Sequence, residues 1–316
     1  MTELATIERD RVAPWIGVGV KGEWTDYRDA LVAAKMDFYV TPQDALTHMD
    51  TITGHDLVTV PGIQVNVRPD TSQIMGVVSN NYGIVQNEDA FSMLQPFTDA
   101  GGVITNAGCT EQGLMFMVLR MHETTILGDK YDVDIMAVNS FNGAFPCAII
   151  MVPTRIICQN MYRGLMGRGN DNVLRFRHGS KVDERLAAAK HALGTVNNYL
   201  AAFENTLENA ANKRMDTQDI MQLVALLFPY PKPGGAREMV TRDRVDMYRK
   251  EFIDKYYCAP DNQKFQGTGM GFVNAYMDYL SHREPTKNMQ GIWADRRLSG
   301  LVSGNDVKSG LIKEAV

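Results

Sequence analysis

The chain has 316 residues, of which 45% are hydrophobic and 22% are charged, an ordinary composition for a globular protein with a sizeable core. Its net charge of −5 excludes a protein that coats nucleic acid over its whole surface. The four cysteines show no paired spacing, so we expect a reducing cytoplasm. No apolar run approaches the ~20 residues that span a bilayer, so we expect no membrane contact.

In the first hundred residues, alternation and capping signals predict two helices and a pair of strands. Asn87 is a good N-cap, because Glu88 and Asp89 follow it in the first turn of the predicted helix. The predicted elements are a helix over 27–35, strands over 58–67 and 74–78 with a break at Pro61-Gly62, and a helix over 87–99.

The clearest signal is an antiparallel meander of four segments rich in branched and aromatic residues. Asn142-Gly143 predicts a two-residue type I′ turn between the last two strands, because both positions tolerate positive φ. Pro146 cannot donate to a ladder, so its strand is expected at an edge or distorted. The predicted strands cover residues 103–109, 114–121, 131–141 and 144–152.

After Pro153 the pattern favours helices. One is predicted over 155–163, then a strand over 173–178, then a long helix capped by Ser180. In that helix the apolar residues step by four and three, from Val182 to Leu207. This seam requires a partner helix, either within the chain or in a second copy. Further helices are predicted over 219–228, 242–257, 270–282 and 307–315. The expected fold class is α+β, with a core over residues 1–214 and a helical lobe over 215–316.

The charge of the chain reverses near its middle. Residues 1–154 hold eight basic and nineteen acidic residues, whereas residues 155–191 hold eight basic against three acidic ones. Lys and Arg hold phosphates, and aromatic rings stack on bases, so this stretch predicts a basic groove that binds single-stranded nucleic acid. The alternative is that these cations neutralise the acidic front half. The expected binding residues are Arg155, Gln159, Tyr162, Arg163, Arg168, Arg175, Phe176, Arg177, Lys181 and Arg185.

Other motifs give weaker signals. Gly17, Gly19 and Gly22 match G-x-G-x-x-G but neither follow a strand nor open a helix, so no dinucleotide site is expected. No two of the six histidines have i, i+4 spacing, and there is no Walker loop or serine elbow. We therefore expect no cofactor and assign no catalytic residue. A metal-dependent nuclease stays open as a third hypothesis, on the carboxylates Glu123, Asp129, Asp132 and Asp134.

Several segments carry a family resemblance over most of the chain. They include WIGVGVKGEW at 15–24, GVVSNNYGIVQNEDAF at 76–91, VNSFNGAFPCAIIMVPTRIICQNMY at 138–162, RFRHGSKVDERLAAAKHALG at 175–194 and GTGMGFVNAYMDYLSHRE at 267–284. With these, the chain resembles the phage/plasmid-like protein family catalogued as domain of unknown function 932. It departs from that family at residues 140–143, where the family tends to have His-Asp-Gly, and at Gln159, inside a Cys-x-Asn motif.

The resemblance implies a gene of a mobile element expressed in a bacterial cytoplasm, and it supplies no reaction. The order of elements is similar to that of phage single-strand annealing proteins, which work as rings or filaments. Our first hypothesis is therefore a non-catalytic protein that binds single-stranded DNA, promotes annealing and forms homo-oligomers. The second is a host-takeover or anti-defence protein that binds a bacterial protein, with its acidic first half mimicking DNA.

Overall fold

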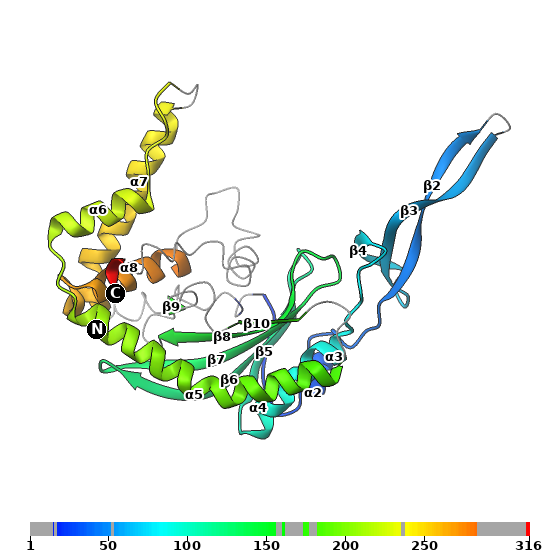
Figure 1. Ribbon diagram of the computed structural model, residues 1–316, viewed down its shortest axis with the longest axis horizontal. Coiled ribbons are helices and arrows are strands. Elements are labelled where there is room, and N and C mark those ends of the chain that lie inside the picture. Colours follow the sequence, from blue (N-terminus) through cyan, green and yellow to red (C-terminus); the bar gives the residue numbers. More distant parts are fainter. Residues whose placement is uncertain are drawn as a thin grey trace.

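The computed structural model describes residues 15, 18–51, 54–155, 160–161, 173–176, 182–234, 238–282 and 314–316 (Figure 1). A seven-stranded antiparallel sheet forms its centre, in the order β1-β5-β6-β7-β8-β10 with β9 also paired to β8. Helices lie along one face of this sheet and continue into a helical lobe, which confirms the α+β class. The strands of the sheet are β1 (Val20–Trp24), β5 (Val103–Cys109), β6 (Met115–Ile126), β7 (Asp129–Asn139), β8 (Cys147–Arg155), β9 (Asn160–Met161) and β10 (Val173–Phe176).

Strands β5 to β8 are the meander that the sequence predicts, but their tight turn lies elsewhere. Leu127 and Gly128 join β6 to β7 with φ of 53° and 79°, both positive, as a two-residue hairpin turn requires. Between β7 and β8 only Gly143 has positive φ, and residues 140–146 form a longer loop. In that loop the Ser140 hydroxyl donates to the Phe145 carbonyl at 2.8 Å, so the turn is built by a side chain as well as by glycine.

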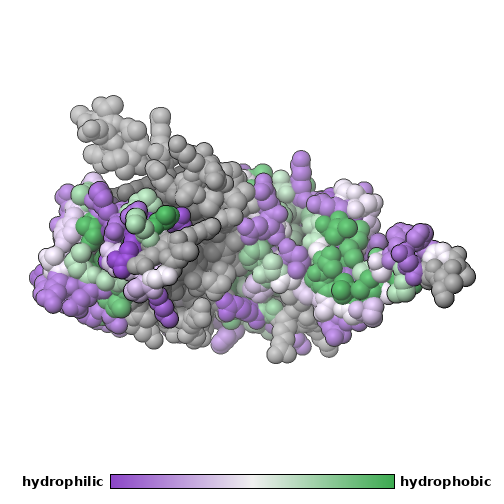
Figure 2. Space-filling model, turned by 90° about the horizontal axis from the view of Figure 1, so that it is seen from above, coloured by the Kyte–Doolittle hydropathy of each residue, from purple (hydrophilic) through white to green (hydrophobic). Residues whose placement is uncertain are grey.

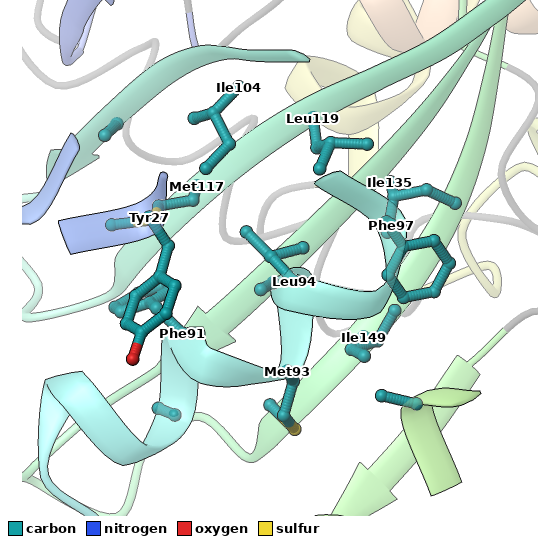
Figure 3. Close-up of a cluster of buried hydrophobic side chains, with 14 of the residues drawn as sticks. Tyr27, Phe91, Met93, Leu94, Phe97, Ile104, Met117, Leu119, Ile135 and Ile149 are labelled. Carbon is teal, nitrogen blue, oxygen red and sulfur yellow. The ribbon is translucent and has the colours of Figure 1, made fainter. Parts of the chain in front are cut away.

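Short helices and the first half of a long helix cover the first face of the sheet. Apolar side chains from α2, α3, η2 and α4 meet those of β5, β6, β7 and β8 in one cluster (Figure 3). Phe91, Leu94 and Phe97 lie on the helical side, and Leu119 and Ile135 lie on the strand side. Alternation along the strands explains the cluster, because every second residue points to this face. The covering elements are α2 (Tyr27–Ala33), α3 (Asn87–Phe91), η2 (Ser92–Leu94), α4 (Gln95–Asp99) and α5 (Val182–Asn212).

Helix α5 confirms the predicted long helix and places its apolar seam inside the molecule. Ala189 and Val196 pack in the cluster on the first face, whereas Phe203 and Leu207 pack in the core of the helical lobe. From Ala189 to Leu207 the seam therefore packs against the chain itself. The other lobe elements are α6 (Thr217–Leu227), α7 (Glu238–Cys258), η3 (Pro260–Phe265) and α8 (Gly269–His282). Of the helix predicted over 307–315, only Glu314 and Ala315 fall within the described residues, and both are helical.

The predicted helix over 155–163 is wrong at the residues of this range that the structure describes, which are Arg155, Asn160 and Met161. Strand β8 continues to Arg155, and Asn160 and Met161 pair with Arg155 and Thr154 as the strand β9. Val152 and Thr154 are buried on the second face of the sheet, with Val152 in an apolar cluster, so the strand that leads into Arg155 is held in place by the core. At these three residues the strand pairing overrides the helical spacing.

A three-stranded sheet projects from the body, and we call residues 41–79 the arm (Figure 1). Its strands are β2 (Thr41–Thr51), β3 (Gly54–Arg68) and β4 (Gln73–Ser79). The first of these was not predicted. Pro61-Gly62 lies in β3 where the register with β2 jumps, so the predicted break is a bulge within a continuous strand.

Side-chain amides fix the base of the arm to the loops of the sheet. The Asn66 amide donates to the Phe141 carbonyl at 2.7 Å. The Asn139 amide donates to the carbonyl of Val85 and to the side chain of Asn87, at 2.9 and 3.1 Å. Asn87 is thus buried and hydrogen-bonded. The N-cap of α3 is Gln86, so the prediction that Asn87 caps this helix is wrong. Because unpaired buried amides are costly, this network specifies how the loops at 80–86 and 140–146 meet.

The glycine fingerprint also has a structural role. A Cβ added to Gly19 would lie 2.3 Å from the Ala107 carbonyl oxygen on β5, so the close approach of the two chains requires glycine. No helix among the described residues is both long and apolar enough to cross a membrane.

Candidate nucleic-acid interface

Arg155 lies inside the protein and does not reach a ligand. It is fully buried, and its guanidinium group donates to Asp129 at 2.6 Å and to Asp261 at 2.9 Å. The Lys264 ammonium reaches the other oxygen of Asp129 at 2.8 Å. The expectation that Arg155 contacts phosphate is therefore wrong, because two carboxylates of the same chain occupy its donors. Its observed role is to join β8 and the start of β7 to η3 in the helical lobe.

Two of the predicted binding residues, Arg175 and Phe176, lie on strand β10 and point to opposite faces of the sheet. Phe176 packs against the apolar cluster of the first face, together with Leu174, so part of its ring is covered by this chain. Arg175 pairs with Ala148 and points to the opposite, second face, where its side chain is exposed. Helix α5 packs on the first face. Arg175 and α5 therefore do not form the two walls of a groove as the sequence analysis expected.

Among the remaining predicted binding residues, Arg185 is the one whose backbone falls within the described part of the chain. Arg185 belongs to α5, whose backbone is described there. Further along the same helix, Lys190 and His191 are exposed. The other residues lie outside the described part of the chain: Gln159, Tyr162, Arg163, Arg168, Arg177 and Lys181.

The carboxylates of the β6–β7 hairpin do not form a common site. Asp129 binds Arg155 and Lys264, whereas Glu123 is half-exposed and lies 3.7 Å from Lys130. Asp132 and Asp134 share the second face, as alternation predicts. Within the described residues, no three His, Cys, Asp or Glu side chains gather as a metal site would require. The geometry of these residues therefore contradicts the metal-dependent nuclease built on all four of these carboxylates.

Asp132 and Asp134 are nevertheless an unusual pair, because both are buried. Asp132 is bonded to Arg120 at 3.0 Å, and burial raises its pKa. Burial, helped by the negative charge of Asp132, raises the pKa of Asp134 to about 7, and Arg120 and Thr154 oppose the shift only in part. One oxygen of Asp134 has no hydrogen-bond partner. A carboxyl group of this kind holds its proton near neutral pH.

The sequence contains a signal for the burial of Asp134, although an aspartate is usually read as an exposed residue. Asp134 shares its face with Met136 and Val138, both fully buried, and with Val152 on the neighbouring strand. Two apolar neighbours at i+2 and i+4 mark the face as a core face. For Arg155, no local signal pointed to Asp261, which is more than a hundred residues away in the chain.

The family comparison confirms the resemblance drawn from the sequence. The model of the family described as "Domain of unknown function (DUF932)" matches residues 74–300. The chain belongs to this family. The match begins in β4 and thus includes the meander, α5 and most of the helical lobe, whereas β2 and β3 of the arm precede it. No curated protein and no solved structure matches the chain.

Proposed function

We propose that this DUF932 protein binds single-stranded DNA through the basic stretch from Arg163 to His191 and promotes annealing of complementary strands. The observation that supports this most directly is the exposed Arg175 on the second face of the sheet. With Arg155 removed, the stretch still carries seven basic residues against three acidic ones. Such a local excess of positive charge in an acidic protein is suited to attract a polyanion.

The proposed contacts differ from those expected from the sequence in two respects. Arg155 is buried and Phe176 packs partly against the apolar cluster, so Tyr162 is the proposed stacking residue, with Gln159 three residues before it in the chain. The phosphate contacts are proposed for the cations that precede and follow β10 in the chain, together with Arg175 itself. These cations are Arg163, Arg168, Arg175, Arg177, Lys181 and Arg185.

The resemblance of the chain to phage and plasmid proteins supports a setting in a bacterial cytoplasm, where the protein would act on DNA of a mobile element. No cofactor is required by this proposal, because annealing needs only that two strands are held and released.

The test is the salt dependence of binding to a short single-stranded oligonucleotide. On a single strand, each neutralised phosphate contributes a slope of about 0.7 in log affinity against log salt. Arg175→Glu is expected to weaken binding and to lower this slope by about 0.7. The matched control is Lys21→Glu, an exposed cation on β1 at the opposite edge of the same sheet.

Fluorescence anisotropy between 50 and 300 mM salt gives the binding affinity and its slope against salt concentration. Equal slopes for the two variants and the unaltered protein would exclude Arg175 from the interface. Binding that is absent at 50 mM salt, or that does not change with salt, would contradict the proposed function as a whole.

A further inference from the structure

A pocket opens where the arm joins the body, and none of its lining residues belongs to the basic stretch. It lies between α2, the segment over 36–40 that leads into β2, and the start of α3 (Figure 1). Its volume is about 240 Å³, below the roughly 300–1,000 Å³ of an ordinary ligand site. The pocket therefore fits one side chain rather than a large ligand.

Hydrogen bonds of side-chain amides hold one wall of the pocket in place. The Gln86 side chain accepts from the Val40 N–H at 3.1 Å and donates to the Val40 carbonyl at 2.8 Å. The Asn87 amide donates to the Met36 carbonyl at 2.9 Å. Both ends of the segment over 36–40 are therefore fixed to the start of α3. A ligand meets a preformed wall, so little conformational entropy is lost on binding.

The side chains of this segment alternate between the core and the pocket rim. Met36 and Val40 are buried, whereas Asp37 and Tyr39 are exposed, and Tyr39 is 71% exposed. Asp37 and Tyr39 both line the pocket. The Asp37 carboxylate forms no ion pair with any described residue. The rim thus offers an aromatic ring and a carboxylate two residues apart.

Arginines of the chain itself already lie over aromatic rings in this region. The guanidinium carbon of Arg28 lies 4.7 Å from the centre of the Tyr27 ring, and that of Arg68 lies 4.2 Å from the centre of the Phe38 ring. The Arg68 guanidinium also binds the Asp70 carboxylate at 2.7 Å. A ring and a carboxylate together are a good site for a guanidinium group, which is planar, charged and weakly hydrated.

The charge of the pocket selects a cation. Of its ten lining residues, three are acids (Asp37, Glu88 and Asp89) and one, Arg28, is basic. The Arg28 guanidinium is itself bonded to Glu88 at 3.3 Å. An anionic ligand would meet more negative than positive charge, whereas a cation is attracted.

We propose that this pocket binds the side chain of an arginine carried by a partner protein. The guanidinium group lies over the Tyr39 ring and donates to Asp37. Its methylene groups lie against the apolar part of the lining, which includes Leu31 and Met36.

The surroundings of the pocket favour a protein over a small molecule as the source of this arginine. Arg68, which covers Phe38 of the pocket, belongs to β3, and β4 pairs with β3. On β4, Ile74 and Val77 are 64% and 61% exposed, and Figure 2 shows a hydrophobic patch between the body and the end of the arm. An ordinary protein interface covers about 800 Å² of each partner, enough to include both the pocket and this apolar surface.

The probe for the test is a peptide with one arginine between two alanines, blocked at both ends, and NMR titration measures its affinity. Matched peptides carry lysine, or citrulline, which keeps the shape of arginine without its charge. The arginine peptide is expected to bind about threefold tighter than the lysine peptide and about tenfold tighter than the citrulline peptide. No binding of the arginine peptide at about 10 mM would overturn the proposal.

Two variants test the assigned contacts. Tyr39→Ser and Asp37→Asn are each expected to weaken binding about threefold to fivefold, the effect of one cation–π contact or one exposed ion pair. The matched controls are Tyr257→Ser and Asp56→Asn, which make the same changes at exposed residues outside the pocket. Circular dichroism confirms that the variants are folded. Controls that weaken binding as much as the pocket variants would show a diffuse attraction to an acidic protein and would overturn the proposal.

Free L-arginine separates a protein partner from a small molecule. Its carboxylate would meet the acids of the rim, so it is expected to bind more weakly than the blocked peptide. Equal or tighter binding of free arginine would overturn the assignment to a partner protein.

The inference is independent of DNA binding. Tyr39→Ser is expected to bind a short oligonucleotide within about twofold of the unaltered protein, because the pocket shares no residue with the basic stretch. The peptide titration contains no DNA, so its outcome does not depend on whether the protein binds single strands. The two proposals can therefore fail separately.

Discussion

At the scale of single residues, burial decides the chemistry of Asp134. Its pKa is raised from 3.8 to about 7, so the folded protein holds this proton more tightly than the unfolded chain does. The folded state therefore loses stability as the pH rises from about 4 to about 7, and the full penalty is present above pH 7. A difference of about three pKa units corresponds to roughly 4 kcal/mol.

Asp134→Asn removes this penalty because an amide does not ionise. The variant is expected to be more stable than the unaltered protein by a few kcal/mol at pH 8, and the difference is expected to shrink toward zero near pH 4. Urea unfolding at pH 8, 7, 6 and 5 measures it. Asp70→Asn is the control, because Arg68 lowers the pKa of Asp70 and its substitution changes stability in the opposite direction. A pH-independent difference for Asp134→Asn would show that packing, not ionisation, is responsible.

At the scale of elements, the turn between β6 and β7 carries an avoidable strain. Leu127 adopts φ of 53°, a left-handed conformation that is unfavourable for leucine and favourable for asparagine. Leu127→Asn is therefore expected to stabilise the protein by roughly 0.5–1 kcal/mol. Thermal unfolding measures the change. The same substitution at the exposed helical Leu226 serves as the control and is expected to destabilise by about 0.5 kcal/mol, since asparagine is the poorer helix former.

The sequence predicted the elements best where pattern and tertiary context agree. The four meander strands and α5 were predicted because their periodicity persists over many residues and is satisfied by a single core. The tight turn was predicted at Asn142-Gly143, because these residues have the better local preference for a two-residue turn. It lies at Leu127-Gly128, because the paired strands β6 and β7 end on either side of these two residues. Arg155 was misread for a similar reason: the helical spacing that begins there is real, but Arg155 continues β8 and pairs with Asn160 of β9.

The candidate site was predicted less well than the fold, because charge in a sequence does not show what lies opposite. Arg155 and Arg175 are equivalent in composition, yet one is fully buried and the other exposed. The difference depends on Asp129 and Asp261, which only the folded chain brings to β8. A run of cations therefore predicts an excess of charge correctly, and the fate of each cation depends on contacts far away in the sequence.

At the scale of the whole molecule, the ion pairs of Arg155 connect the stability of the sheet to that of the helical lobe. Arg155 binds Asp129 of the sheet and Asp261 of the lobe, and its own guanidinium group is shielded from water. Removing one member of a buried ion pair leaves the others uncompensated, at a cost of about 3–5 kcal/mol. Arg155→Met keeps most of the side-chain volume and removes the charge, so it isolates this effect.

The expected result is a loss of about 3–5 kcal/mol in the free energy of unfolding, measured in urea at neutral pH. Lys264→Met is the matched control, since Lys264 also binds Asp129 but is half-exposed, and it should cost no more than about 1 kcal/mol. If the two variants lose the same small amount of free energy of unfolding, the lobe is held to the sheet mainly by the apolar packing of α5 and α8. If Arg155→Met alone is costly, an arginine from the most basic part of the chain joins the sheet to the lobe, and the proposed DNA contact depends on the other cations of that stretch.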